Sequence, residues 1–219
     1  MKSQDILVLL RVVSLELAEV RLPGGVQDAE RAVAKLPFDW EGWEPEPSEV
    51  MYLPASDLGE TALAEYYSAR ALAEAVGISK TEVSASLRRS MEAGLARRDR
   101  LSGLPRANRS ALLEMAEHCL RWVFPVRPGP LARGIATGFA APVLADQVLS
   151  AGEDPYVWPD ARGKATGQGI TPLYKSVPQA VCGDPDLYAM LALLDALRLG
   201  QPRERSIARD KLAAILELP

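Results

Sequence analysis

Residues 66–95, YYSARALAEAVGISKTEVSASLRRSMEAGL, decide how the N-terminal half of this chain folds. Ser68 and Ser79 are each placed to cap a helix, because a serine side chain can accept a hydrogen bond from the free backbone N–H groups at a helix start. Gly77 lies between them, where a left-handed residue ends one helix and turns the chain. Glu82, three residues after Ser79, completes an S-x-x-E capping box. The stretch therefore predicts two short helices joined by a tight turn.

The second predicted helix has two chemically different sides. Val83, Leu87 and Met91 recur at every fourth residue and are expected to face the core. The other side carries small or hydrogen-bonding side chains: Ser79, Lys80, Thr81, Ser84, Ala85, Arg88 and Arg89. Short side chains let a helix approach DNA bases, while Lys and Arg reach guanine edges or phosphates. This side therefore predicts a helix that reads the major groove of DNA.

An arginine-rich stretch follows Leu95. Ser102 and Gly103 are expected to form the tip of a hairpin or loop. Five arginines surround that tip: Arg97, Arg98, Arg100, Arg106 and Arg109. A basic hairpin directly after a recognition helix is in the position of a wing, so we expect these side chains to hold phosphate or the minor groove.

The charge of this region differs from that of the rest of the chain. Residues 66–110 hold nine Lys or Arg and four acids, a net of +5, whereas the whole chain has a net charge of −4, which leaves −9 for the remainder. Any two amphipathic helices around a glycine could share the caps and apolar stripes described above. A basic island in an acidic protein is, however, typical of phosphate binding, and it favours the DNA-binding interpretation.

Length and composition bound the class of protein. A chain of 219 residues fits one large or two small domains, and 48% hydrophobic with 25% charged residues indicates an ordinary globular core. No apolar run reaches the roughly 18–20 residues that span a bilayer, and the N-terminus lacks the pattern of a signal peptide. Cys119 and Cys182 form neither a disulfide framework nor a metal set. We expect a cytoplasmic protein that does not contact membranes.

Residues 4–20 predict a helix, which is followed by an acidic insertion at about 22–65. The inner face of that helix is expected to hold Ile6, Leu9, Leu10, Val13, Leu17 and Val20. Residues 26–65 contain ten acids and two bases, and a connection of this length is unusual. Its Trp40 and Trp43 could dock a protein partner, or its negative charge could oppose non-specific DNA binding. We favour a third interpretation, a solvated surface segment whose tryptophans pack back on the core.

Proline and glycine at 124–130 predict a boundary. We therefore expect a DNA-binding domain at 1–125, which ends in a helix at 109–122, and a C-terminal domain at 126–219 that serves dimerisation or partner binding. Residues 126–150 indicate irregular structure. The predicted fold class is mainly α with a small β part (α+β).

In the C-terminal half, residues 156–174 predict a short β-hairpin and the segments 184–199 and 202–216 predict a helical hairpin. The hairpin region is rich in glycine but lacks G-x-x-x-x-G-K-[ST] and a G-x-G-x-x-G before a helix. We interpret its glycines as residues for turns and close backbone approach rather than as a phosphate loop.

Residues with catalytic potential do not form a recognisable set. His118 and Cys119 are adjacent, and neighbouring side chains on a helix point about 100 degrees apart, so they do not converge as a catalytic pair. A zinc site needs at least three suitable ligands, and none cluster in the sequence. We expect no enzyme activity, no cofactor and no metal.

Beyond these patterns, the chain resembles a family of bacterial winged helix-turn-helix proteins often labelled MarR-like. The stretches that carry the resemblance are residues 1–16, 67–95, 105–125, 157–159, 172–178 and 184–208. It covers most of the chain except the acidic insertion, which replaces the usual short connection before Tyr66. The C-terminal part resembles an uncharacterised domain and lacks the long helical dimer module of true MarR proteins. The resemblance implies a DNA-binding regulator of its own operon, with a link to toxin or defence genes.

Three functional hypotheses follow. The first is a transcriptional regulator, a repressor or autoregulator that binds double-stranded DNA as a homodimer, since one short recognition helix reads few base pairs and a palindromic site supplies more. The second is an antitoxin-like or defence-associated interaction protein whose winged helix is an adjunct and whose partner binds the C-terminal domain or the Trp40/Trp43 segment. The third is a ligand sensor with a pocket in residues 126–180.

Overall fold

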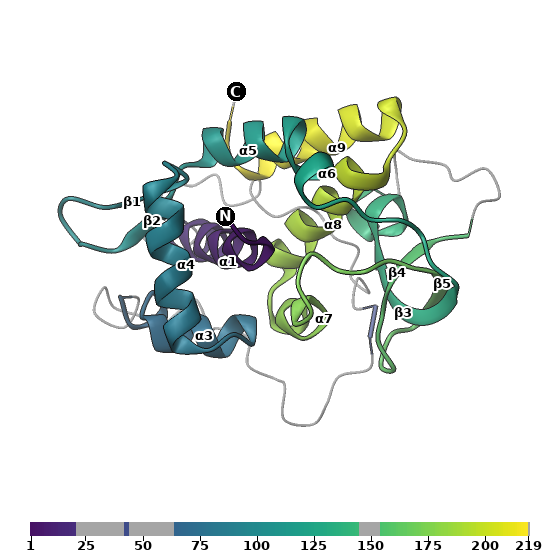
Figure 1. Cartoon of the computed structure of the whole chain (residues 1–219), viewed down its shortest axis with the longest axis horizontal. Coiled ribbons are helices and arrows are strands. Elements are labelled where there is room, and N and C mark those ends of the chain that lie inside the picture. Colours follow the sequence, from purple (N-terminus) through teal and green to yellow (C-terminus); the bar gives the residue numbers. More distant parts are fainter. Residues whose placement is uncertain (21–41, 44–63, 145–153, 219) are drawn as a thin grey trace.

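The computed structural model describes residues 1–20, 42–43, 64–144 and 154–218. Its architecture is α+β, with helices making up most of the described chain and two small β units at opposite ends (Figure 1). The longer helices are α1 (Ser3–Val20), α3 (Ala69–Val76), α4 (Lys80–Glu92), α5 (Arg109–His118), α8 (Pro185–Leu199) and α9 (Pro202–Ile215). The shorter ones are α6 (Leu120–Val123) and α7 (Val177–Ala180). The strands are β1 (Ala96–Arg98), β2 (Pro105–Ala107), β3 (Leu131–Thr137), β4 (Tyr156–Pro159) and β5 (Ala165–Gly169).

Helices α1 and α8 form the centre of the molecule. Every residue from Ile6 to Leu10 is 0% exposed, and Leu15 on another side of α1 is 1% exposed. The sequence analysis expected one inner face that ended in Val20, but Val20 is 45% exposed. A helix that is apolar on all sides belongs inside a core, and α1 is buried on all sides along most of its length.

One hydrophobic core joins the N-terminal and C-terminal segments. Helix α1 packs against α3 and α4 on one side and against α8 on the other. A single cluster of buried hydrophobic residues includes both Ile6 in α1 and Leu216 after α9. The boundary expected at residue 125 therefore lies between two segments that share a core.

The local signals at the ends of the helices are confirmed. The Ser68 side chain accepts a hydrogen bond from the Ala71 backbone N–H at 3.1 Å, and the Ser79 side chain accepts one from the Glu82 N–H at 3.3 Å. Gly77 ends α3 with a φ of +63°. The capping box at Ser79 is only half formed, because the Glu82 carboxylate turns toward Arg89 and α1 instead of returning to the cap.

The predicted β-hairpin at 156–174 is wrong in its pairing. Strands β4 and β5 exist, but each pairs antiparallel with β3, and they lie parallel to each other. Strand β3 falls in the stretch expected to be irregular. Gly134 pairs with both neighbours, and a Cβ atom there would collide with the carbonyl group of Trp158. A Cβ on Gly163 would collide with the Gly134 backbone and a Cβ on Gly167 with the Pro155 carbonyl, so the interpretation of glycines in residues 156–174 as close-approach residues is confirmed.

A buried polar cluster fixes this sheet to α8. The Asp195 carboxylate accepts hydrogen bonds from Trp158 Nε1 at 2.6 Å, Thr137 Oγ1 at 2.9 Å and Arg198 Nη1 at 2.6 Å. Burial raises the pKa of Asp195, against the opposing effects of Arg198 and the two other donors. Since each polar group has a partner, burying this cluster does not leave an unsatisfied charge.

Two further helix predictions have different outcomes. Helices α8 and α9 pack as a helical hairpin, as expected, whereas the helix predicted at 109–122 is interrupted at Cys119.

Trp43 is 2% exposed and packs edge-on against Tyr188 with a ring distance of 6.0 Å. Packing of Trp43 on the core is confirmed, and Trp40 lies outside the described residues.

Candidate nucleic-acid interface

Helix α4 presents its predicted polar side to solvent. Val83 is 0% and Leu87 9% exposed on the core side. The residues that the sequence analysis placed on the outer side are found as follows: Ser79, Lys80, Thr81, Ser84 and Arg88 are exposed, and Ala85 is half-buried. The outer side of α4 therefore consists of a lysine, an arginine and short hydroxyl side chains.

Two small residues of α4 that were not part of its predicted core side are buried. Ser86 and Ser90 are both 0% exposed, and α1 and α4 are among the most closely packed helix pairs of the described chain. Small side chains at a helix contact let the two backbones approach. Their four-residue spacing is the signal that could have indicated a second buried row beside Val83 and Leu87.

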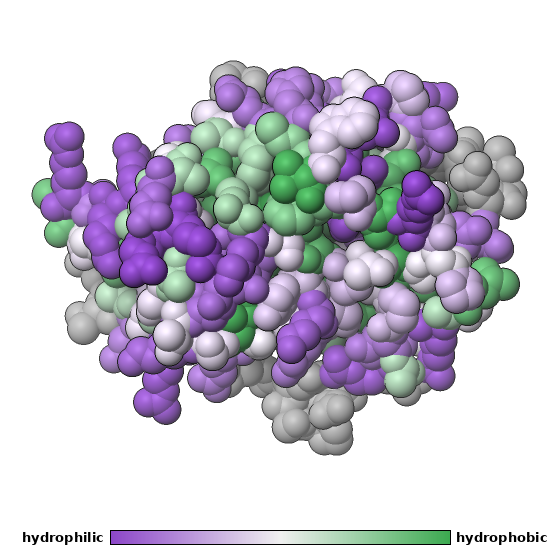
Figure 2. Space-filling view, in the orientation of Figure 1, coloured by the Kyte–Doolittle hydropathy of each residue, from purple (hydrophilic) through white to green (hydrophobic). Residues whose placement is uncertain are grey.

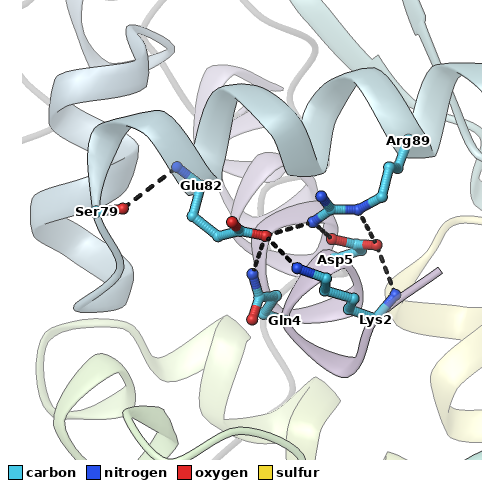
Figure 3. A network of polar contacts seen from close by, with 6 residues as sticks. All are labelled: Lys2, Gln4, Asp5, Ser79, Glu82 and Arg89. Carbon is cyan, nitrogen blue, oxygen red and sulfur yellow. Dashed lines mark hydrogen bonds and ion pairs between the residues drawn. The ribbon is translucent and has the colours of Figure 1, made fainter.

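Arg89 lies on the side of α4 that faces α1, in the polar network of Figure 3. Its Nε donates to Asp5 at 3.0 Å, and its Nη2 donates to Asp5 at 2.6 Å and to Glu82 at 2.8 Å. Lys2 and Gln4 at the start of the chain donate to the same Glu82 carboxylate at 3.1 and 2.5 Å. Sequence analysis placed Arg89 on the DNA-reading side, whereas here its guanidinium is held by α1 and by its own helix.

The network keeps the buried carboxylate of Asp5 ionised. Burial alone would raise the pKa of Asp5, but hydrogen bonds from the Arg89 guanidinium and the Lys2 backbone N–H bring the pKa below its ordinary value. The half-buried Glu82 also has a lowered pKa, because its carboxylate accepts hydrogen bonds from Arg89 and Lys2. An ionised acid in α1 thus clamps α4 through a bidentate guanidinium, which has strict directional requirements.

Two further arginines of the predicted DNA-binding set are paired with α1 in the same way. Arg106 Nη1 donates to Glu19 at 2.7 Å and to the Tyr67 hydroxyl at 3.0 Å. Arg109 Nε donates to Glu16 at 3.1 Å, and its Nη1 donates to Glu217 at 2.7 Å. These guanidinium groups connect the hairpin and α5 to α1.

Strands β1 and β2 form the expected basic hairpin. They pair antiparallel in the register Ala96↔Ala107 to Arg98↔Pro105. At the tip, Gly103 has a φ of +69°, which favours glycine. The Asp99 carboxylate accepts hydrogen bonds from the backbone N–H groups of Leu101 and Ser102 at 3.1 and 2.8 Å. The tip is therefore ordered by its own side chains.

Three arginines of the hairpin are exposed, namely Arg97, Arg98 and Arg100. Arg98 Nη1 donates to the Gly103 carbonyl at 2.9 Å, which holds this side chain along the hairpin. Of the nine basic residues at 66–110, five make no ion pair with any described residue: Arg70, Lys80, Arg97, Arg98 and Arg100. The region thus keeps uncompensated positive charge at the surface.

A groove of about 590 Å³ joins the outer side of α4 to the hairpin. Leu87, Met91 and Pro105 line its apolar part. Its polar rim comes from three elements: Ser68 before α3, Ser84 and Arg88 of α4, and Arg98 of β1. Glu92 also lines it and lies 3.9 Å from Arg88. Figure 2 shows hydrophilic side chains gathered over α4 and the hairpin.

Comparisons with known proteins identify no relative of this chain. No protein-family model matches it, and neither the curated proteins nor the solved structures contain a match.

Metal-binding and membrane-spanning features are absent from the part of the chain that the structure describes. No group of three His, Cys, Asp or Glu side chains in it is placed to hold a metal ion. Within the same residues, no helix combines the length and apolarity needed to cross a bilayer. His118 is exposed at the end of α5, beside Glu117 at 3.9 Å.

Proposed function

We propose that this chain is a sequence-specific, double-stranded-DNA-binding regulator of transcription, a cytoplasmic repressor or autoregulator. In this proposal α3, α4 and the β1–β2 hairpin form a winged helix-turn-helix, with α4 as the recognition helix and the hairpin as the wing. The observation that carries it is the groove shared by α4 and the hairpin, whose rim holds Arg88 and Arg98 beside two serine hydroxyls.

The exposed side chains divide by reach. Thr81 and Ser84 are short and lie near the start of α4, so they suit contacts with base edges once the helix enters the major groove. Lys80 and Arg88 flank them and can reach guanine or phosphate. Arg97, Arg98 and Arg100 extend from the hairpin and suit the DNA backbone or the minor groove, which positions the protein without specifying sequence.

A homodimer is part of the proposal. A single α4 reads few base pairs, and two-fold binding to a palindrome doubles the readout. If the two halves of the palindrome lie one helical turn of DNA apart, the β1–β2 hairpins of the two protomers would lie along the DNA backbone that flanks these halves. A palindromic binding site is therefore the expected signature of the dimer.

An interaction protein of the antitoxin-like or defence-associated kind is the second candidate. It is favoured by Trp122 and Val123 of α6, which are 73% and 58% exposed. Exposed large apolar side chains that adjoin one another are typical of protein-binding surfaces. In this case a protein partner covers α6, and the helix-turn-helix plays a minor role.

Selection of bound duplexes from a random DNA library, followed by affinity measurements at increasing salt, tests the first candidate. The expected result is an enriched palindromic motif and an affinity that falls steeply between about 50 and about 200 mM salt, because several phosphate counterions are released. Double substitution of Arg97→Gln and Arg100→Gln should reduce the slope of log affinity against log salt by about 1 for each phosphate that the variant no longer neutralises.

Arg203→Gln is the matched control, since Arg203 is an exposed arginine in the first turn of α9, outside the groove. It should leave both the motif and the salt slope unchanged. Absence of binding to any duplex at low salt would refute DNA binding. In that event, loss of a co-purifying protein on Trp122→Ala would support the second candidate.

A further inference from the structure

A second pocket, of about 310 Å³, lies between α5, α8 and α9. None of its lining residues belongs to the groove between α4 and the hairpin. Helix α9 contributes Arg205, Ser206 and Arg209, helix α5 contributes Glu117 and His118, and α8 contributes Leu197. The residues of α9 recur at three- and four-residue spacing, so one face of that helix forms a wall of the pocket.

Arg205 is the unusual member of this lining. Its Nε atom is buried and has no hydrogen-bond partner among the described residues. A buried donor without an acceptor carries a free-energy cost, and such a group in a native structure calls for an acceptor from outside the chain, such as an ion or a water molecule. Arg205 lines the pocket, so an acceptor bound there can meet its guanidinium.

The charges around the pocket leave Arg205 uncompensated. Glu117, the one carboxylate among the described residues of the lining, accepts from Arg209 Nε at 3.3 Å, and Arg209 also pairs with Asp210 at 3.2 Å. Glu117 is therefore neutralised locally and opposes an incoming anion less. Arg205 forms no ion pair with any described residue.

We propose that this pocket binds a small phosphate-bearing molecule. Arg205 would supply the charge, and the Ser206 hydroxyl and the His118 imidazole would add hydrogen bonds from two different helices. A guanidinium binds phosphate with two parallel hydrogen bonds, and donors from a second helix can meet the remaining phosphate oxygens. Leu197 and Pro202 give a compact apolar part of the ligand a surface to rest on.

The chain offers a direct reporter for the test, because His118 is its only histidine. Inorganic phosphate is titrated into the full chain at fixed pH, with ionic strength held constant by chloride, while the His118 imidazole resonances are followed by NMR. The expected result is a saturable shift. Arg205→Gln should weaken phosphate binding about tenfold or more, since it removes a charge-assisted hydrogen bond.

Arg203→Gln again serves as the control, because it removes an exposed charge two residues away that does not line the pocket. It should keep the phosphate affinity, and Arg205→Lys should keep part of it. A shift that grows linearly without saturation, or equal affinities in wild type and Arg205→Gln, would overturn the site. Acetate that binds as tightly as phosphate would overturn the phosphate class. The proposal stands or falls independently of DNA binding.

Discussion

Six of the eight arginines of residues 66–110 fall into an inner set and an outer set with opposite surroundings. The inner set, Arg89, Arg106 and Arg109, is paired with Asp5, Glu19 and Glu16 of α1 at 2.6 to 3.1 Å. The outer set, Arg97, Arg98 and Arg100, is exposed and makes no ion pair within the described part of the chain. Both sets occur in one basic stretch, so a count of charges alone does not distinguish them.

The difference shows that basic residues serve two purposes in this region. Carboxylates of α1 bind the inner set and thereby fix α4, the hairpin and α5 to the central helix. The outer set, together with Arg70, Lys80 and Arg88, is available to an external phosphate. If this division is right, substitutions in the inner set should affect folding and substitutions on the exposed face should affect DNA binding.

Arg89→Ala should have the largest effect on folding. It leaves the Asp5 carboxylate, which is 0% exposed, without its main partner. Removing one partner of a buried ion pair typically costs about 3–5 kcal/mol, and we expect about 3 kcal/mol because the Arg89 side chain is 23% exposed. The measurement is the free energy of unfolding in urea at neutral pH.

A double-mutant cycle separates the pair from the loss of side-chain packing. Asp5→Ala combined with Arg89→Ala should be less destabilised than the sum of the two single variants, because the double variant holds no unpaired buried charge. The folded fraction of Arg89→Ala should keep the DNA affinity of the wild type. Purely additive free energies would contradict the clamp, and a loss of DNA affinity without a loss of stability would move Arg89 to the outer set.

Arg88→Ala tests the adjacent position on the outer side of α4. The Arg88 side chain is 74% exposed and its one ion pair, with Glu92, is 3.9 Å long, so the stability should change by no more than about 0.5 kcal/mol. If Arg88 reads a guanine, affinity for the selected duplex should fall by about 1–3 kcal/mol, with a smaller loss for random DNA. Fluorescence anisotropy on both duplexes measures this. An equal loss on the two would assign Arg88 to phosphate.

The features that local sequence could predict are those that depend on local interactions. Ser68, Gly77 and Ser79 mark helix ends through hydrogen bonds or backbone angles within a few residues. The amphipathic character of α4 follows equally from the spacing of Val83 and Leu87. At these elements the prediction from sequence agrees with the structure, because interactions with residues far along the chain compete only weakly with the local ones.

The features that the sequence analysis missed depend on partners far along the chain. Asp5 lies 84 residues from Arg89 in the sequence, and this ion pair holds the Arg89 guanidinium against α1 instead of leaving it to solvent. Glu82 fits a capping box, but Arg89, Lys2 and Gln4 offer it three donors that the N-cap cannot match. A glycine within β3 interrupts its sequence, so the strand was not predicted. The close approach of Gly134 to Trp158 explains why glycine occupies that position.

The smallest expected effect is a dependence of stability on pH. The pKa of Asp5 lies below its ordinary value of 3.8 in the folded protein. Between the unfolded and folded pKa values the unfolded state binds more protons, so the stabilisation by Asp5 is complete above about pH 3.8 and is lost as the pH falls below it. Asp5→Asn cannot lose a charge, so its stability should fall less steeply than that of the wild type below that pH.

Urea unfolding of both proteins from about pH 6 to about pH 3 measures the difference. Only the slopes are compared, because the substitution also lowers stability at every pH. Glu16, whose pKa is raised by burial, is present in both proteins and cancels. Parallel curves would mean that Arg89 does not hold an ionised Asp5 in the folded state. Arg89 would then leave the inner set, which would keep Arg106 and Arg109.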